Sequence, residues 1–225
     1  MERKTPLYQT HVDAGGKIVE FGGFLMPVQY PTGVLAEHMA VRQKAGLFDV
    51  SHMGELRLKG PDAVANVQKL ITADISAMQD GDIKYAMFCN DAGGIIDDFI
   101  VYRCAADDYW LVVNAGNRDK DAAWVESHLF GDVDYRDEGD DWGQVALQGP
   151  KSGDILSKSS ARSSTFPRSI TPLSTTFRST SAAAPFTLSF PRQAIPANTA
   201  LSSTAGLRTP LTSGTPCSPR ARSTA

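Results

Sequence analysis

Hydrophobic and polar positions follow two different spacings along the first 155 or so residues. Alternation of apolar and polar residues predicts strands, and apolar residues three or four positions apart predict helices. Strands are expected at residues 55–59, 83–89, 95–103, 109–114, 133–136 and 144–147. Helices are expected at residues 33–45, capped by Thr32, at 61–71, and from a cap at Asn117 to about Phe130. Strands and helices mix without a regular β-α-β repeat, which predicts an α+β fold with a mixed antiparallel sheet.

The clearest local unit is a β-hairpin. Two apolar runs, 83–89 and 95–103, flank the segment Asn90-Asp91-Ala92-Gly93-Gly94. Asn, Asp and Gly favour the tight turns that join antiparallel neighbours. The second run therefore pairs with the first, and its own alternation decides which side chains share a face.

The pattern stops after Leu156. Residues 158–225 hold 26 Ser or Thr, eight of the 13 prolines and no acidic residue, whereas all 25 acidic residues lie at or before Asp154. Such a composition buries too little apolar surface to offset chain entropy. We therefore divide the sequence into residues 1–156, the folded region, and residues 157–225, a low-complexity Ser/Thr/Pro/Arg tail. The tail has three interpretations: a natural disordered segment, an ordered second domain, or the product of a shifted reading frame, which the loss of acids favours.

Composition and charge exclude several classes of function. No apolar run approaches the roughly 20 residues that span a bilayer, and the N-terminus lacks the apolar core of a signal peptide, so we expect a cytoplasmic protein without a membrane partner. The three cysteines and four histidines show neither disulfide nor metal-ligand spacing, so no metal is expected. The basic tail lacks Tyr and Trp, and nucleic-acid binding is not expected.

Two consecutive carboxylates interrupt the apolar strand at residues 95–103. Alternation puts Asp98 on one face with Ile100, and Asp97 on the other face with Phe99. Aspartate is disfavoured in strands and costly to bury unpaired. The doublet has three interpretations: a hydrogen-bonded structural Asp, a charged edge strand that resists aggregation, or a functional carboxylate.

Eight motifs, in order over about 155 residues, carry a resemblance to a known family. They are Thr5-Pro6-Leu7-Tyr8 with His11, Gly15-Gly16-Lys17, Phe21-Gly22-Gly23-Phe24, Met26-Pro27-Val28-Gln29-Tyr30, Leu47-Phe48-Asp49-Val50-Ser51-His52-Met53, Gly93-Gly94-Ile95-Ile96-Asp97-Asp98, Val113-Asn114-Ala115 and Ala146-Leu147-Gln148-Gly149-Pro150. The sequence resembles the aminomethyltransferases, or T-proteins, of the glycine cleavage system. The family's later Arg-Thr-Gly-Tyr-Thr-Gly-Glu run is absent, so the resemblance covers the N-terminal part only.

The resemblance implies a folate site. By it, Asp98 is the catalytic carboxylate, and Asp97 is structural. The residues that the resemblance places at the folate are Met53, Tyr85, Tyr102, Val112 and Asn114. Asn114 would face the pterin, where an amide can serve donor and acceptor edges. His52 is interpreted as a structural histidine rather than a catalyst.

The reaction that the resemblance implies moves a one-carbon unit. A lipoyl group on the partner H-protein brings the aminomethyl carbon, tetrahydrofolate accepts it, and ammonia leaves. A carboxylate in a partly apolar site suits the proton handling and the cationic carbon of this chemistry. Three alternatives stay open: a folate-dependent demethylase, a non-catalytic folate-binding relative, and a non-functional truncated product, which the tail favours.

Overall fold

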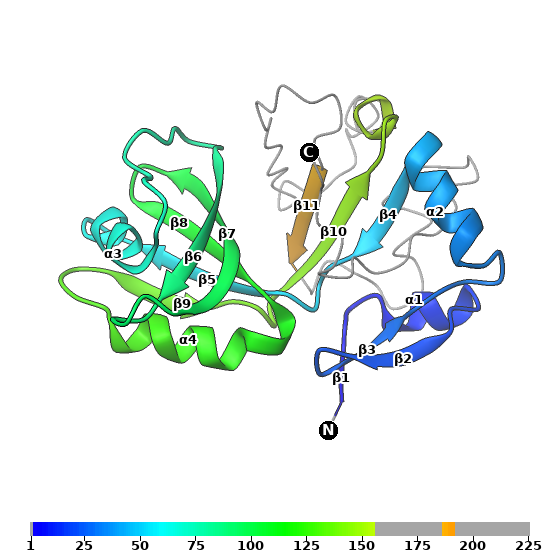
Figure 1. The fold of residues 1–225 in the computed structure, drawn as a ribbon, viewed down its shortest axis with the longest axis horizontal. Coiled ribbons are helices and arrows are strands. Elements are labelled where there is room, and N and C mark those ends of the chain that lie inside the picture. The colour runs from blue at the N-terminus through cyan, green and yellow to red at the C-terminus, as the bar shows by residue number, and fades with distance from the viewer. Residues whose placement is uncertain (1, 156–185, 192–225) are drawn as a thin grey trace. The chain divides into compact units, whose positions relative to one another are not determined.

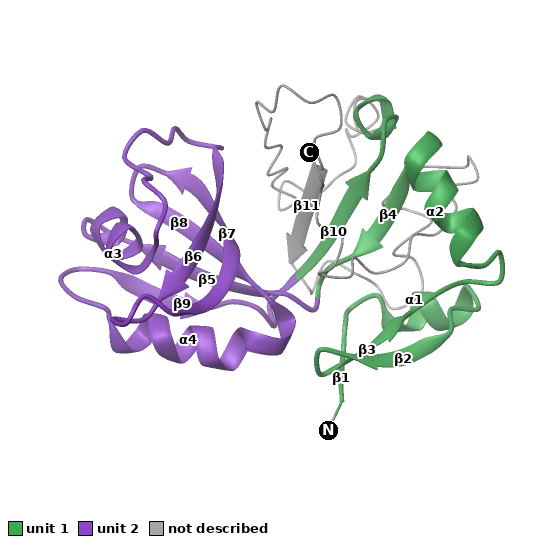
Figure 2. Cartoon of the chain, viewed as in Figure 1, with its two compact units in different colours: residues 1–51, 143–174, 178–225 green, residues 52–142, 175–177 purple. Residues whose placement is uncertain are grey.

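The computed structural model describes residues 2–155 and 186–191 (Figure 1). These residues form two compact units, coloured separately in Figure 2. Unit 1 holds residues 2–51, 143–155 and 186–191, and unit 2 holds residues 52–142. The sequence pattern does not predict this division, because it indicates only one folded region, residues 1–156.

The described part of unit 1 contains two small sheets, two helices and a further helical turn at residues 152–155. In the first sheet, β3 (Phe24–Pro27) pairs in parallel with β1 (Arg3–Lys4) and antiparallel with β2 (Ile18–Phe21). In the second, β10 (Trp142–Gln148) lies between β4 (Gly46–Asp49) and β11 (Phe186–Pro191). The helices are α1 (Tyr8–Asp13) and α2 (Val34–Gln43).

A buried polar cluster around Asp49 ties the N-terminal segment to β4. The Asp49 carboxylate accepts a bond from the Thr5 hydroxyl at 2.7 Å, lies 2.9 Å from Nε2 of His11, and accepts the Ser51 N–H at 2.9 Å. Nδ1 of His11 in turn lies 2.7 Å from the Tyr30 hydroxyl. Burial raises the pKa of Asp49, but the bonds to His11, Ser51 and Thr5 outweigh burial and lower it below 3.8.

Unit 2 is a five-stranded antiparallel sheet with two helices and one 3-10 turn. The strands lie in the order β6 (Ile83–Cys89), β7 (Ile95–Ala105), β8 (Asp108–Val113), β5 (Gly54–Lys59) and β9 (Asp134–Asp137). The helices are α3 (Ala63–Leu70) and α4 (Arg118–Ser127), and α4 follows the turn η1 (Ala115–Asn117).

One face of the unit 2 sheet forms the hydrophobic core with α3 and α4. Phe99 and Val101 of β7 pack in it with Leu111 of β8, Val67 of α3 and Val125 of α4. All five side chains are at most 2% exposed. The opposite face of the same strands is therefore the one left for a site.

The observed elements confirm the predicted α+β class and most of the predicted segments. The hairpin has the expected turn, with the Asn90 N–H bonded to the Gly94 carbonyl and a positive φ of 80° at Gly93. Thr32 does not cap α2; Gly33 occupies the N-cap position with a φ of 82°. Within the predicted tail, 157–225, the structure describes only strand β11, and the rest of the tail lies outside the described residues.

None of the helices in the described residues is both long and apolar enough to cross a membrane.

Replacing Asp49 by Asn is expected to lower the free energy of unfolding by about 1–3 kcal/mol at pH 7. An amide offers one acceptor oxygen where the carboxylate uses both. Because the pKa of Asp49 lies below 3.8 in the folded chain, its contribution is present above that pH and lost as the pH falls through the folded pKa. Urea unfolding of the full chain at pH 7 and pH 3 measures both effects. The exposed Asp91→Asn change is the control, and an equal loss at both pH values would contradict the role of ionised Asp49.

Candidate functional site

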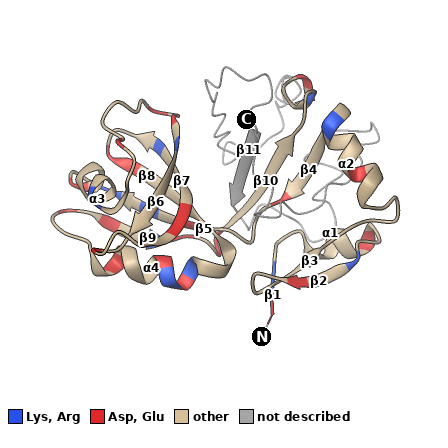
Figure 3. Ribbon diagram, in the orientation of Figure 1, with Lys and Arg blue, Asp and Glu red and all other residues tan. Residues whose placement is uncertain are grey.

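The two carboxylates of the β7 doublet lie on opposite faces of the unit 2 sheet. Asp97 is 6% exposed and lies on the core face with Phe99, whereas Asp98 is exposed on the face that carries Ile100. Acidic residues interrupt β7 in Figure 3. The predicted alternation is therefore the observed one, and it gives the two carboxylates different environments.

The Asp98 carboxylate is held from the neighbouring strand β6. The hydroxyl of Tyr85 donates a hydrogen bond to Oδ2 of Asp98. Tyr85 pairs with Ile100 in the β6–β7 register, two residues beyond Asp98, and its ring is 59% exposed. The pair thus presents a phenol and a carboxylate at the same open face.

Asn114, directly after β8, contacts both members of the doublet. Its Nδ2 donates to Oδ1 and Oδ2 of Asp97 at 3.1 and 3.2 Å, and to the main-chain carbonyl of Asp98 at 2.7 Å. Its side chain is half-buried. Three of the predicted site residues, Tyr85, Asp98 and Asn114, are therefore brought together by hydrogen bonds between adjacent segments.

The remaining predicted residues lie around this group. Val112 pairs with Ile100, which also pairs with Tyr85, so Tyr85 and Val112 flank one β7 residue. Tyr102 is two residues further along β7 on the same face, and it is 3% exposed. Met53 directly precedes Gly54, whose partner is Val113, so the register brings Met53 next to Asn114. His52 is buried at 4% exposure.

Two residues that the sequence does not assign to the site, Asn117 and Asp121, complete the surroundings of Asp97. Asn117 Nδ2 donates to Oδ1 of Asp97 at 2.9 Å, so its side chain does not cap α4 although it occupies the N-cap position. Asp121, one turn into α4, is completely buried. Asn117 and Asp121 both follow Asn114 at helical spacing. This spacing is the only indication in the sequence that the three residues lie together near Asp97.

Asp121 is a neutral acid near physiological pH. Burial, followed by the hydrogen bond to Asp97 and the charge of Asp97, raises the pKa of Asp121 to about 8, while Lys120 acts against the rise. If Asp121 were ionised, neither of its oxygens would have a donor within the described part of the chain. A proton on Asp121 supplies the donor, because the carboxyl O–H can then bond the Asp97 carboxylate.

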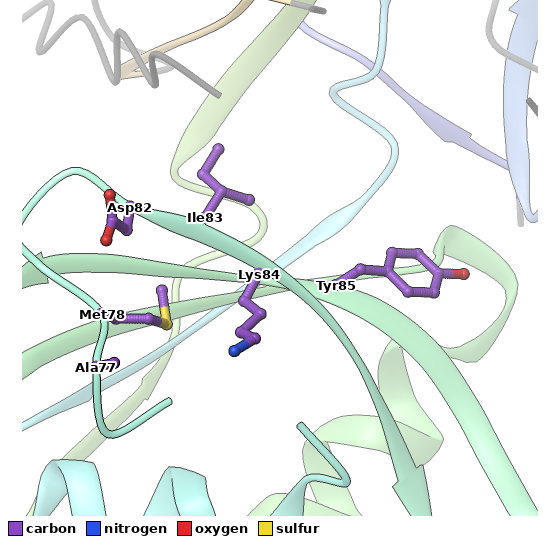
Figure 4. A pocket seen from close by; sticks show the side chains of 6 residues that line it. All are labelled: Ala77, Met78, Asp82, Ile83, Lys84 and Tyr85. Atoms are coloured by element: carbon purple, nitrogen blue, oxygen red, sulfur yellow. The ribbon is translucent and has the colours of Figure 1, made fainter. Parts of the chain in front are cut away.

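A shallow cavity of about 350 Å³ lies on the outer side of β6. Its lining residues, shown in Figure 4, are Ala77, Met78, Asp82, Ile83, Lys84 and Tyr85. Tyr85 is the one predicted site residue among them, and its ring extends away from Ala77 and Met78. The cavity is therefore not the site formed by Asp98 and Asn114.

Among the described residues, no group of three or more His, Cys, Asp or Glu side chains is arranged to hold a metal ion.

Comparison with known protein families shows which family the chain belongs to. The family model described as the GCVT N-terminal domain matches residues 7–187. The chain belongs to this family. The match begins at Leu7, directly before α1, and contains every residue of the group around Asp98.

The relatives of this GCVT N-terminal domain are named aminomethyltransferases. Those of Desulfitobacterium hafniense and Staphylococcus haemolyticus are each 51% identical to it over 157 residues, which is 69% of this chain and 43% of the relative. The crystal structure of glycine cleavage system aminomethyltransferase T from Bartonella henselae matches with a TM-score of 0.76 and 30% identity, covering 91% of this chain and 57% of that one. The chain thus spans less than half the length of the curated relatives that it matches.

Asn117→Asp is expected to destabilise this GCVT N-terminal domain by about 1–3 kcal/mol. Aspartate is as good an N-cap as asparagine, so a capping role predicts no change. The structure predicts a loss, since a carboxylate cannot donate to Asp97 and repels it. Urea unfolding measures the difference.

The matched control is Asn90→Asp. Oδ1 of Asn90 accepts the N–H groups of Ala92 and Gly94, and a carboxylate can accept both. Equal stability of Asn117→Asp and the wild type would show that the Asn117 amide is not needed by Asp97.

Asp121→Asn is expected to stabilise the protein increasingly as the pH rises. A carboxyl group whose pKa is raised from 3.8 to about 8 on folding makes the wild type less stable as the pH increases between these values. The variant lacks this titration, so the difference in free energy of unfolding between the variant and the wild type widens by at most about 1.4 kcal/mol per pH unit. Thermal unfolding at pH 5, 7 and 9 tests the trend, and a constant gap would contradict the raised pKa.

Proposed function

We propose that this chain supplies the folate-side part of a glycine cleavage aminomethyltransferase. The reaction transfers the one-carbon unit of the aminomethyl-lipoyl group on H-protein to tetrahydrofolate, with release of ammonia. The observation that carries the proposal is the exposed Asp98 carboxylate, held by Tyr85 beside Asn114, in a chain that is 51% identical to aminomethyltransferases. We expect the reaction in the cytoplasm.

Asp98 is the proposed catalytic residue. Its carboxylate is exposed, so a substrate can reach it, and the Tyr85 hydroxyl bond directs one of its oxygens. Tetrahydrofolate supplies the nucleophilic nitrogen when it is bound. A carboxylate at this point can accept a proton from that nitrogen and can stabilise positive charge on the transferred carbon.

The remaining residues are proposed to position the folate. The exposed ring of Tyr85 offers an aromatic surface beside Asp98, and the half-buried Met53 offers a soft apolar one. Val112 and Tyr102 are buried in the sheet face below them, and they support that surface. Asn114 provides a polar contact for the pterin at the edge of this apolar area.

The partner that this proposal requires is the lipoylated H-protein. The lipoyl arm carries the aminomethyl group, so the carbon must reach Asp98 from outside the chain. The exposure of Asp98 and Tyr85 supports such access.

Asp98→Asn is expected to lower the rate of methylene transfer by about 10²–10⁴-fold while the affinity for tetrahydrofolate changes less than about threefold. The amide keeps the size and the Tyr85 contact of the carboxylate but loses its basicity and charge. The measurement is glycine-dependent formation of methylenetetrahydrofolate and ammonia with aminomethylated H-protein, beside calorimetric binding of tetrahydrofolate.

Asp91→Asn in the exposed turn before β7 is the matched control, and it should behave as the wild type. Unchanged transfer by Asp98→Asn would contradict the catalytic role. Folate binding by the wild type without any transfer would instead favour the non-catalytic alternative.

A further inference from the structure

The Asn114 amide has a single possible orientation. Both hydrogens of Nδ2 are used, since the group donates to Asp97 and to the Asp98 carbonyl. The reversed amide would turn Oδ1 toward these same three acceptor oxygens and lose every one of the bonds. Within the described residues no donor reaches Oδ1, so Asn114 presents a hydrogen-bond acceptor to its surroundings.

Residues at the start of α4 in turn hold Asp97 in place. Asn117 donates to its Oδ1 at 2.9 Å, and the buried Asp121 carboxyl contacts it from α4. Lys120, also on α4, fixes the adjacent β7 backbone by donating to the Ile96 carbonyl at 2.7 Å. The Asp97 carboxylate is therefore held in place on the core face of the sheet, where the residue is only 6% exposed.

We propose that Asp97 is a positioning residue: it holds the Asn114 amide with Oδ1 outward, so that the site beside Asp98 selects a ligand group that presents an N–H donor. The same Nδ2 bonds the Asp98 carbonyl, so the arrangement also sets the β7 backbone under the proposed catalytic carboxylate. This inference rests on the proposed function and narrows it. Asn114 recognises a donor edge of the pterin, and its own donor hydrogens are not available to the ligand.

The test exchanges the acid and the amide. Asp97→Asn and Asn114→Asp are each expected to weaken tetrahydrofolate binding by about tenfold or more, because the first leaves one acceptor oxygen for the amides of Asn114 and Asn117 and the second sets one carboxylate against another. In the double variant D97N/N114D, the new amide can donate to the new carboxylate, which still presents an acceptor outward, although the bond to the Asp98 carbonyl is lost. We expect its affinity to recover in part, to a value above that of either single variant. The probe is tetrahydrofolate under anaerobic conditions, with the full 225-residue chain, and Asp91→Asn is the control.

A purely structural role for Asp97 predicts additive losses in the double variant, and that result would overturn the proposal. So would wild-type affinity in Asp97→Asn.

A second measurement separates this inference from the proposed function. In the wild type, the side-chain amide hydrogens of Asn114 should exchange with solvent at least about tenfold more slowly than those of exposed Asn90, observed by ¹⁵N–¹H NMR. Slow exchange without any folate binding would support the positioning role and contradict the folate function. Equal exchange of the two amides would overturn the positioning role, whether or not folate binds. This measurement uses the wild type, so it does not depend on the folding of a variant.

Discussion

A carboxylate on the core side of a β-strand must be satisfied, and the site around β7 depends on how Asp97 is satisfied. Burial of an unpaired charge costs several kcal/mol, so donors have to be brought to it. They come from the end of β8 and from the start of α4, as the amides of Asn114 and Asn117. The turn between these two segments is therefore constrained by the charge that both of them contact.

The same constraint gives the two members of the doublet different chemistry. Asp97 is surrounded by two amides and a neutral acid, and it is withdrawn from solvent. Asp98, one residue later, is exposed and contacts a phenol. The alternation of a strand converts adjacent positions in sequence into one internal and one external carboxylate. A helix could not do so, because its neighbouring side chains differ in direction by only about 100°.

Local patterns predict the fold of unit 2 better than that of unit 1. The β6–β7 hairpin and the opposite faces of the doublet follow from alternation and from turn residues within a few positions. Strand β4 is not predicted, because its four residues gain their partner only from β10, where Leu47 pairs with Leu147. The roles of Asn117 and Asp121 are equally non-local. An Asn before a helix is an ordinary cap, and only its closeness to β7 turns it into a donor for Asp97. The resemblance to a family implies roles for Asp98 and Asn114, but it offers no reason for Asp97.

The pairing of β4 with β10 has a consequence for the folding of the chain during its synthesis on the ribosome. Among the described residues, unit 2 is one uninterrupted stretch, residues 52–142, between β4 and β10, which pair with each other in unit 1. All its sheet partners have therefore emerged before β10 is synthesised, and unit 2 can complete its sheet while β4 still lacks a neighbour. The order of translation thus favours assembly of the proposed chemical centre first, with the pairing of β4 and β10 in unit 1 as a later event.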